Sequence, residues 1–406
     1  MKRRRLIKGL IGLGVVGGVG YWQASRHWDG FVSNPCKLGL PEPLKNSELW
    51  QTIWQGIDSS KVMDCHVHTV GLGDANSGIW VNPQMQSWRH PIQHAQFKFY
   101  MNAACIKQPE QADSEYVAQL MALQSDMPVG FKSMLFAFDY HHNDKGQAVK
   151  ELSTFYVPNE YPAKLAQQNP DKFEWAASIH PYRADAIDAL EQAKTQGAVG
   201  VKWLPPAQNM DPMSARCDAF YRKLEELDMA LICHAGTEKA VKGSDTQELG
   251  NPLRLRRALD QGVKVVVAHC ATLGENEDLD KTSKPMTDSF ELFKRLMSEY
   301  QENLYGELSA TLQINRSPEK LKYLIENQEW HSRLVNGSDY PLPAVMPLIS
   351  LKRLIRANLL DEKWQADLNL LRQHNGLAFD FAVKRLLQSN GQQFSTQIFE
   401  TQNVFK

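Results

Sequence analysis

Short apolar runs alternate with longer stretches of helical periodicity along most of the chain. The apolar runs cover residues 61–67, 132–138, 174–179, 198–203, 229–233, 263–268, 303–308 and 333–337. Between them, apolar residues recur at helical spacing over residues 112–125, 160–169, 184–196, 214–227, 252–261, 286–300 and 317–327. Strands that alternate with helices form parallel βαβ units, so this pattern predicts an α/β fold of the closed (β/α)8 TIM-barrel type. An open doubly wound sheet is the alternative, but no G-x-G-x-x-G follows the first strand.

The pattern also predicts how the chain is divided. The predicted parts are a signal or anchor segment at 1–30, a linker with a short helix at 31–60, the barrel at 61–390 and a tail at 391–406. The segment at 69–111 is too long for an ordinary loop between a strand and a helix. An insertion at this place in a barrel is expected to shape the substrate pocket.

The first residues have the layout of an export signal. A basic start, MKRRR, precedes an apolar stretch from Leu6 to Trp22. The run RRRLIK at 3–8 resembles a twin-arginine signal, which suits an enzyme exported already folded around a cofactor. Since no clear A-x-A cleavage site follows, we predict either a cleaved signal peptide or a retained inner-membrane anchor. Both predict an extracytoplasmic, periplasmic barrel, and a basic N-terminus on a cytoplasmic protein is the alternative.

Composition and charge narrow the choice of partners. The 406 residues carry a formal net charge of -1, and 43% of them are hydrophobic, which is typical of a globular protein with a large core. No basic stripe follows the first residues, so nucleic acid is not expected as a partner. We expect a small-molecule substrate, membrane contact only through residues 1–25, and a homo-dimer as the default assembly.

The six cysteines do not have the pattern of a disulfide framework. Cys65, Cys233 and Cys270 each lie in an apolar run directly beside a histidine. Because neighbours on a strand point to opposite faces, these thiols are expected to pack on the side away from the histidines. A single bridge stays open among the remaining cysteines, Cys36, Cys105 and Cys217, if the compartment is oxidising.

Polar side chains collect at the carboxyl ends of the predicted strands. They are His66, His68, His180, Lys202, His234, His269 and Asp339. All strands of a parallel barrel end on one face, where the active sites of such barrels lie, so these residues are expected to converge. Polar groups are unfavourable to bury unless they are paired. The joint pattern therefore indicates a site, although a lone His-x-His is weak evidence.

The spacing of His66 and His68 indicates a metal site. Residues two apart project from the same side of a strand, so the two imidazoles can present nitrogens to one ion. His234 and Asp339 would add a nitrogen and an oxygen, a ligand set that suits Zn²⁺, with Fe²⁺, Mn²⁺ or Ni²⁺ as alternatives. Taken singly, His234 or His269 could be a hydrogen-bonded core histidine, and Asp339 could be a helix cap.

The motifs DCHVH, GVKWLPP, LICHAG, VVVAHC and LVNGSDYP occur in this order with the spacing of a barrel. Together they resemble the amidohydrolase superfamily, and within it the amidohydrolase-related branch that also contains metal-dependent decarboxylases. The resemblance implies that His66, His68 and His234 bind metal. It implies that Asp339 binds metal and acts as acid and base. His269 would be a second-metal ligand or a substrate-polarising residue.

The resemblance, which covers about residues 61–385, leaves the role of Lys202 open. In two-metal members of the superfamily, a lysine of the fourth strand is carbamylated and bridges the ions. Single-metal members dominate the branch, so one Zn²⁺ ion is favoured and two are the alternative. Lys202 could instead bind an anion or extend to solvent.

Three functions are compatible with these motifs. The first is hydrolysis of an amide, ester or lactone of a small molecule by a metal-activated water, with Asp339 and His269 as catalytic residues. Candidates for holding the substrate are His180, Arg183, Trp203 and Glu238. The second is decarboxylation of an aromatic or dienoic acid, whose carboxylate Lys202, Arg183 or Arg89 would clamp. The third is a non-catalytic, metal-binding protein tethered to the membrane, and the complete set of strand-end ligands argues against it.

Overall fold

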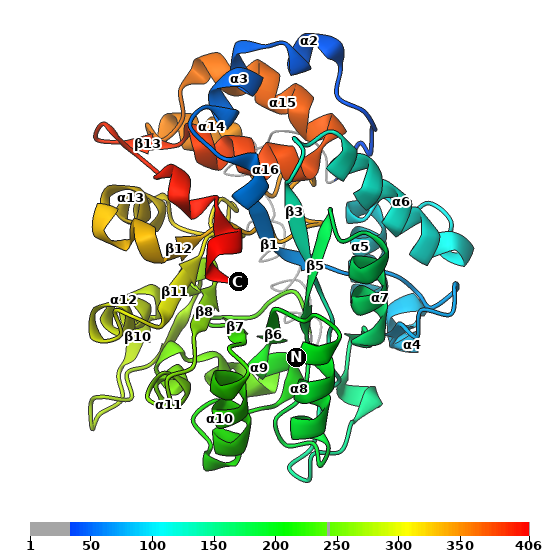
Figure 1. Cartoon of the computed structure of the whole chain (residues 1–406), viewed down its shortest axis with the longest axis vertical. Coiled ribbons are helices and arrows are strands. Elements are labelled where there is room, and N and C mark those ends of the chain that lie inside the picture. The colour runs from blue at the N-terminus through cyan, green and yellow to red at the C-terminus, as the bar shows by residue number, and fades with distance from the viewer. Residues whose placement is uncertain (1–32, 242–243, 406) are drawn as a thin grey trace, which may run out of the picture.

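Eight parallel strands form the barrel that the alternating pattern predicted. The computed structural model describes residues 33–241 and 244–405. Figure 1 shows the strands at the centre with helices around them. In order of pairing, the strands are β1 (Met63–His68), β3 (Lys132–Phe136), β5 (Phe173–Ala177), β6 (Gly200–Trp203), β7 (Ala230–His234), β8 (Val265–Ala268), β11 (Leu304–Glu307) and β12 (Leu334–Val335). Each overlaps one predicted apolar run, which confirms the TIM-type α/β fold.

Backbone hydrogen bonds between β1 and the segment after β12 close the barrel. The N–H of Cys65 donates to the carbonyl of Asn336, that of Asp339 to His66, and that of His68 to Tyr340, each at 3.0 Å. The first and last strands are far apart in the sequence. Their seam nevertheless holds His66, His68 and Asp339 next to one another.

The barrel strands are buried on both sides, which explains why they are apolar throughout. Met134, Ile232 and Val266 lie in a cluster inside the barrel. Leu231 and Val267, on the opposite side of their strands, belong to the outer core under the helices. The inner cluster fills the interior of the barrel, and polar side chains occupy the carboxyl ends of the strands.

The prediction for Cys65 is wrong, because its thiol belongs to the inner cluster. Cys233 and Cys270 belong to the outer core, as predicted. The pairing of β1 with β3 shifts register between Asp64 and Val67. An irregularity of this kind breaks the strict alternation of side chains, so Cys65 can share a side with the histidine next to it.

Helices cover the outside of the barrel (Figure 1). The helices are α2 (Glu42–Lys45), α3 (Glu48–Trp54), α4 (Pro83–Gln86), α5 (Pro91–Ala103), α6 (Ala112–Ser125), α7 (Glu160–Gln168), α8 (Ala186–Thr195), α9 (Pro205–Gln208), α10 (Asp218–Glu226), α11 (Arg256–Leu259), α12 (Ser289–Glu299), α13 (Pro318–Glu326), α14 (Leu351–Arg356), α15 (Gln365–His374) and α16 (Gly376–Leu386). Short strands outside the barrel are β2 (Trp80–Val81), β4 (Phe155–Tyr156), β9 (Glu275–Glu277), β10 (Met286–Asp288), β13 (Gln388–Ser389) and β14 (Gln392–Gln393). The predicted helix at 252–261 is instead a 3-10 turn, Pro252–Leu255, followed by α11.

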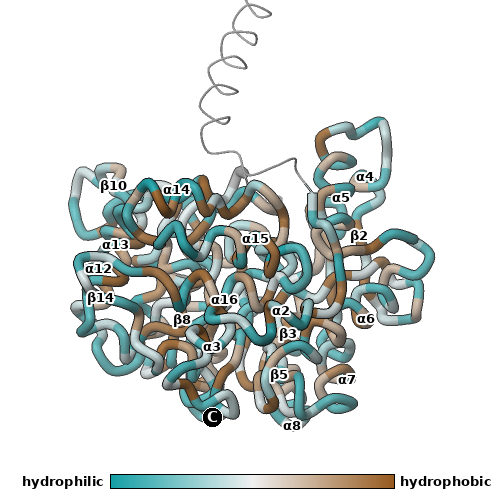
Figure 2. Tube along the Cα trace, turned by 90° about the horizontal axis from the view of Figure 1, so that it is seen from above, coloured by the Kyte–Doolittle hydropathy of each residue, from teal (hydrophilic) through white to brown (hydrophobic). Residues whose placement is uncertain are grey.

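The insertion at 69–111 has its own secondary structure. It contains β2, α4 and α5, and β2 pairs in antiparallel fashion with β4. Figure 2 shows α4, α5 and β2 together at one side of the molecule. A disulfide joins Cys36 to Cys105 at the end of this insertion, while Cys217 is free. One of the bridges that the sequence left open is therefore present.

The segment predicted as a tail, residues 391–406, packs against the N-terminal end of the barrel. Gln402 Nε2 donates to the carbonyl oxygens of Ser60 at 3.0 Å and Val62 at 3.1 Å. Phe405 belongs to the inner cluster. The last described residues thus cover the end of the barrel opposite the polar strand ends.

Residues 1–30, predicted as a signal peptide or anchor, lie outside the described residues. Within residues 33–241 and 244–405, no helix is long and apolar enough to cross a membrane. The signal or anchor segment therefore stays a prediction.

Candidate metal centre

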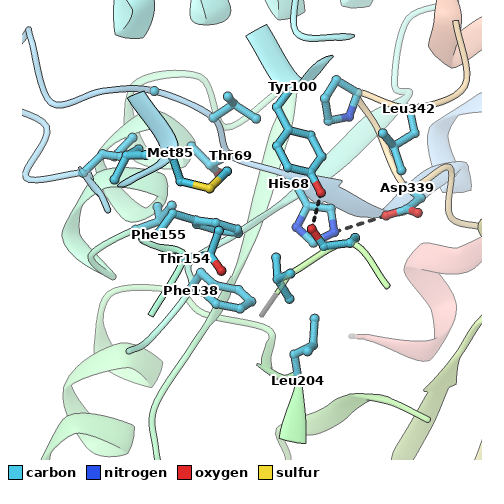
Figure 3. A pocket seen from close by; sticks show the side chains of 18 of the residues that line it. His68, Thr69, Met85, Tyr100, Phe138, Thr154, Phe155, Leu204, Asp339 and Leu342 are labelled. Carbon is cyan, nitrogen blue, oxygen red and sulfur yellow. Dashed lines mark hydrogen bonds and ion pairs between the residues drawn. The ribbon is translucent and has the colours of Figure 1, made fainter. Parts of the chain in front are cut away.

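The two histidines of β1 face each other at the carboxyl end of the strand. His66 Nε2 lies 3.3 Å from His68 Nε2. Asp339 places Oδ1 3.1 Å from His68 Nε2 and 3.5 Å from His66 Nε2. The backbone turns sharply at Asp339, whose φ is 65°, and its carboxylate points toward His68 (Figure 3). The structure therefore brings together three of the predicted metal ligands.

His234 and His269 lie beside this group. The ring centroid of His269 is 5.1 Å from that of His66 and 5.4 Å from that of His234. His269 Nδ1 lies 3.1 Å from the carbonyl oxygen of Ser309. Among the described residues, His234 Nε2 is buried and meets no hydrogen-bond partner. Because an unpaired buried polar atom is costly, this nitrogen is suited to a ligand that the protein binds.

Glu307 is a site residue that the sequence reasoning missed. It ends β11, is fully buried at 0% exposure, and places Oε2 3.0 Å from His66 Nδ1. The hydroxyl of Ser309 donates to the same oxygen at 2.6 Å. Metal-binding histidines commonly donate their other ring N–H to a carboxylate, which orients the ring. The signal was present in NLYGEL, an apolar strand whose end carries a carboxylate.

Gly337 allows the end of β12 to approach this pair. A Cβ at this position would lie 2.4 Å from Glu307 Oε1 and 2.6 Å from the Cβ of His66. These distances are shorter than non-bonded atoms tolerate, so only glycine fits without a shift of its neighbours. The glycine of the LVNGSDYP motif thus helps to place Asp339.

Burial controls the protonation of the cluster. It lowers the pKa of His234 to about 3 and lowers the pKa values of His66 and His269 well below the usual value. Burial opposes the charge of Asp339, but the hydrogen bond with His68 and the nearby imidazoles outweigh it, so the pKa of this carboxyl lies well below its usual value. Neutral imidazoles and an ionised carboxylate are the states that bind a metal cation.

The arrangement fits a divalent cation. Two groups of three residues have potential ligand atoms within 4.8 Å of one another: His66, His68 and Asp339, and His66, His269 and Glu307. In the second group, His66 offers the Nδ1 that already pairs with Glu307. In the first group, the Nε2 atoms of two imidazoles and a carboxylate oxygen face one another, and His234 Nε2 is unpaired nearby. Nitrogen and oxygen donors of this kind suit Zn²⁺ and related divalent ions.

The cluster forms the inner end of a pocket (Figure 3). The pocket encloses about 1040 Å³ of empty space, counting the part open to solvent. The histidine, lysine and carboxylate residues that line it are His66, His68, Lys202, His234, Glu238, His269 and Asp339. Lys202 is 1% exposed, and its Nζ lies 5.1 Å from the ring centroid of Phe136 inside the barrel. Lys202, which ends β6, and Glu238, a predicted substrate-binding residue that follows β7, therefore both line the pocket.

Trp203, predicted as a substrate-binding residue, lies outside the pocket. It packs in the outer core, where its Nε1 donates to the carbonyl of Ile179 at 2.9 Å. Its ring centroid is 5.2 Å from that of Phe220. Side chains alternate along β6, so the inward position of Lys202 turns Trp203 outward.

His180 and Arg183 also lie away from the pocket lining, in a second polar cluster beside β3 and β5. His180 is fully buried, and its ring centroid is 4.4 Å from that of His142. Arg183 Nη1 donates to Asp139 Oδ2 at 3.0 Å, and the same oxygen accepts the backbone N–H of His180 at 2.9 Å. His142 is 3% exposed, so both histidines of this second cluster are buried.

A barrel with this cluster at its strand ends has the architecture of a metal-dependent enzyme. A family model described as amidohydrolase matches residues 63–368. The chain therefore belongs to the amidohydrolase family, as the motifs indicated.

Several solved structures match most of the chain at low sequence identity. An uncharacterized TIM-barrel protein from Bordetella bronchiseptica is 17% identical, with a TM-score of 0.45, over 79% of this chain and 99% of that one. A Pseudomonas putida protein with a proposed 2-pyrone-4,6-dicarboxylic acid hydrolase activity is 16% identical, with a TM-score of 0.42, over 80% and 98%. The 5-carboxyvanillate decarboxylase from Sphingomonas paucimobilis is 12% identical, with a TM-score of 0.41, over 79% and 98%. No curated protein sequence matches the chain.

Proposed function

We propose that this protein is a metal-dependent hydrolase that cleaves an amide, ester or lactone bond of a small molecule. The observation that carries the proposal is the carboxylate of Asp339, which faces the pocket 3.1 Å from His68 Nε2. Within the described part of the chain, this carboxylate has no lysine or arginine partner and is available to accept a proton. One Zn²⁺ ion held by His66, His68, His234 and Asp339 is the cofactor we favour.

When bound, the cation supplies Lewis acidity, which polarises the substrate carbonyl and acidifies water. Asp339 takes a proton from the attacking water and returns it to the leaving group. Lys202 donates a hydrogen bond to the negative charge that develops on the carbonyl oxygen. Glu307 holds the ring of His66 through Nδ1, which keeps Nε2 directed at the site.

The geometry bears on the two roles that the resemblance left open for His269. Its Nδ1 lies 2.7 Å from the hydroxyl oxygen of Ser309, whose hydrogen is donated to Glu307 Oε2, and 3.1 Å from the carbonyl oxygen of Ser309. Both oxygens therefore accept a hydrogen bond from Nδ1. The neutral ring therefore carries its proton on Nδ1 and presents the lone pair of Nε2 to the pocket. A ring in this state can bind a second ion through Nε2 but cannot donate a hydrogen bond from that nitrogen to the substrate. A ligand role for His269 therefore requires a second ion, and the zinc count below tests for it.

Decarboxylation is the second candidate function. Of the cations predicted to clamp a carboxylate, Lys202 lines the pocket. Arg183 is paired with Asp139, and Arg89 is exposed beside the ring of Trp88, 5.6 Å from its centroid. Lys202, beside the ligand cluster, could pair with a substrate carboxylate at the reacting end of the pocket. The experiment below therefore also measures decarboxylation.

The experiment that tests the proposal measures product and metal together. Full-length protein is purified with zinc supplied, and its metal content is compared with that of the Asp339→Asn variant. Esters, lactones and amides are scored for acid release, and carboxylated aromatic acids for carbon dioxide. Acid release that needs Asp339 supports the hydrolase. Carbon dioxide release without hydrolysis, or a protein that binds no metal, would overturn it.

The number of ions is tested with Lys202→Ala. About one equivalent of zinc that persists in this variant supports a single ion. About two equivalents that fall in the variant would instead indicate a carbamylated Lys202 that bridges the ions.

A further inference from the structure

Beyond the ligand cluster, the wall of the pocket is mostly apolar. Its polar members are Thr69, Thr154 and Tyr100, whose hydroxyl donates to the carbonyl of Ala240. Val81 from β2, Phe97 and Met101 from α5, Phe155 from β4 and Leu204 after β6 all line the pocket. Figure 3 shows Phe155 and Leu204 around the space in front of His68 and Asp339. The insertion and β4, far apart in the sequence, therefore build one hydrophobic wall.

The charged groups of the pocket are confined to its inner end. Lys202 is the single lysine or arginine among the described residues that line the pocket. Glu238 accepts hydrogen bonds from the backbone N–H groups of Ala240 and Val241, and its Oε2 lies 3.6 Å from His234 Nδ1. Its carboxylate is thus engaged by backbone donors and by the edge of the ligand cluster. Nothing described in the outer part of the pocket would neutralise a charged substrate.

This separation of polar and apolar surface should favour substrates with an uncharged hydrophobic body over substrates that carry a second charge. Each methylene group that moves from water to an apolar wall improves binding about fourfold. A carboxylate in the same place would lose its hydration without gaining a partner, which disfavours it strongly. The space in front of the ligand cluster, about 1040 Å³ when the part open to solvent is counted, lets a substrate body extend from the reacting group along the wall.

We propose that the pocket takes a substrate with a single polar head, the scissile ester, lactone or amide, and an uncharged hydrophobic body. The proposal rests on the hydrolase function above. The head lies at the histidines and Asp339, and the body lies along α5, β2 and β4. Water adds to the carbonyl carbon, the bond to the leaving oxygen or nitrogen breaks, and the proton from water passes to that leaving atom. The products are a hydrophobic acid and an alcohol or amine, joined in one molecule when the substrate is a lactone.

The test is a chain-length series on the full-length, zinc-loaded protein. The substrates are p-nitrophenyl esters from acetate to dodecanoate, together with the suberate monoester, which carries a carboxylate at the far end of the octanoate chain. We expect kcat/KM to rise about fourfold per methylene until the wall is covered. We expect the suberate monoester to be at least about tenfold worse than the octanoate ester.

Two variants test whether the preference for the octanoate ester over the suberate monoester arises at the outer wall of the pocket. Val81 is half-buried on β2, and Val81→Arg would place a cation in the outer part of the pocket. We expect it to shift the ratio between the two matched esters at least about tenfold toward the suberate monoester. Ile92→Arg is the control, because Ile92 lies on α5 but is 79% exposed and outside the pocket lining. It should leave the ratio unchanged, so that a general effect of added charge is separated from a local one.

The outcomes separate this proposal from the hydrolase function. Hydrolysis with a flat chain-length profile, or with a preference for the suberate monoester, overturns the hydrophobic substrate and leaves the hydrolase. If no ester is hydrolysed, the affinities of alkyl hydroxamates, measured by calorimetry, decide the matter. Affinity that rises with chain length supports the hydrophobic substrate and counts against the hydrolase. Affinity that does not change with chain length overturns the proposed substrate class.

Discussion

Two histidine-bearing clusters lie near the carboxyl ends of the barrel strands, and they differ in what their carboxylates do. In the candidate metal centre, the ion pairs of Asp339 among the described residues are with His66 and His68. In the second cluster, Asp139 is bound to the guanidinium of Arg183 at 3.0 Å. The first carboxylate is open to a ligand, whereas the second is already neutralised.

An unpaired imidazole nitrogen does not separate the two clusters. Within the described residues, both His234 and His180 bury an Nε2 atom that has no hydrogen-bond partner. The difference lies in the neighbours, since His234 lines a pocket beside other histidines and Asp339, and His180 does not line it. A histidine at a strand end is therefore a candidate metal ligand when it lines a cavity and lies beside a carboxylate that is not paired with a lysine or arginine.

The largest effect is expected from Asp339→Asn in the metal centre. Loss of the proton acceptor should lower kcat/KM by about 10²–10⁴-fold. Steady-state kinetics on the best ester of the series measures this loss, and thermal unfolding of the zinc-loaded variant checks that it is folded. A variant that keeps near wild-type kcat/KM would show that Asp339 is not the general base.

The matching change in the second cluster, Asp139→Asn, should act on stability instead. Breaking the buried end of the Arg183 pair is expected to cost about 2–3 kcal/mol of unfolding free energy, reduced from the cost of a fully buried pair because the guanidinium is partly exposed. Urea denaturation measures this loss, and kcat/KM should change by less than about tenfold. A loss of activity equal to that of Asp339→Asn would erase the distinction between the clusters.

Glu307→Gln tests whether the metal centre depends on the carboxylate behind His66. A weaker acceptor at Nδ1 should lower zinc affinity about 10–100-fold, because the ring is less well oriented and less basic. Competition with a chromophoric chelator measures this affinity. Glu299→Gln is the control, since Glu299 pairs with Arg256 on the surface. Unchanged affinity in Glu307→Gln would show that Glu307 is a packing residue.

The smallest effect is a pH dependence in the second cluster. Burial and the nearby His142 lower the pKa of His180 to about 2 in the folded protein, from about 6.5 in the unfolded chain. The unfolded chain therefore binds a proton below pH 6.5 that the folded protein does not bind. Stability should fall by about 1.4 kcal/mol per pH unit for this histidine as the pH drops below 6.5.

Urea denaturation between neutral pH and pH 5 measures that slope, and His180→Asn should reduce it. Equal slopes in the wild type and the variant would show that His180 is protonated in the folded protein or does not contribute.

Much of the fold and part of the site could be predicted from the sequence. The eight strands, the pairing of His66 with His68 on one side of a strand, and the place of Lys202 in the pocket follow from periodicity along each strand. Trp203 was misplaced because a functional role was given to both neighbours on β6, although alternation allows only one of them to face inward. Cys65 was misplaced because an irregular register cannot be read from an apolar run.

The sequence by itself determined which residues stand at the strand ends and, where a strand is regular, that two neighbours face opposite sides, because both depend on local spacing. Only the tertiary structure decided which strand ends meet. The seam between β1 and the segment after β12 joins Asp339 to His66 and His68, and β11 brings Glu307 to His66. Such contacts depend on the register and closure of the barrel, which are properties of the packed strands and are not encoded in any single run.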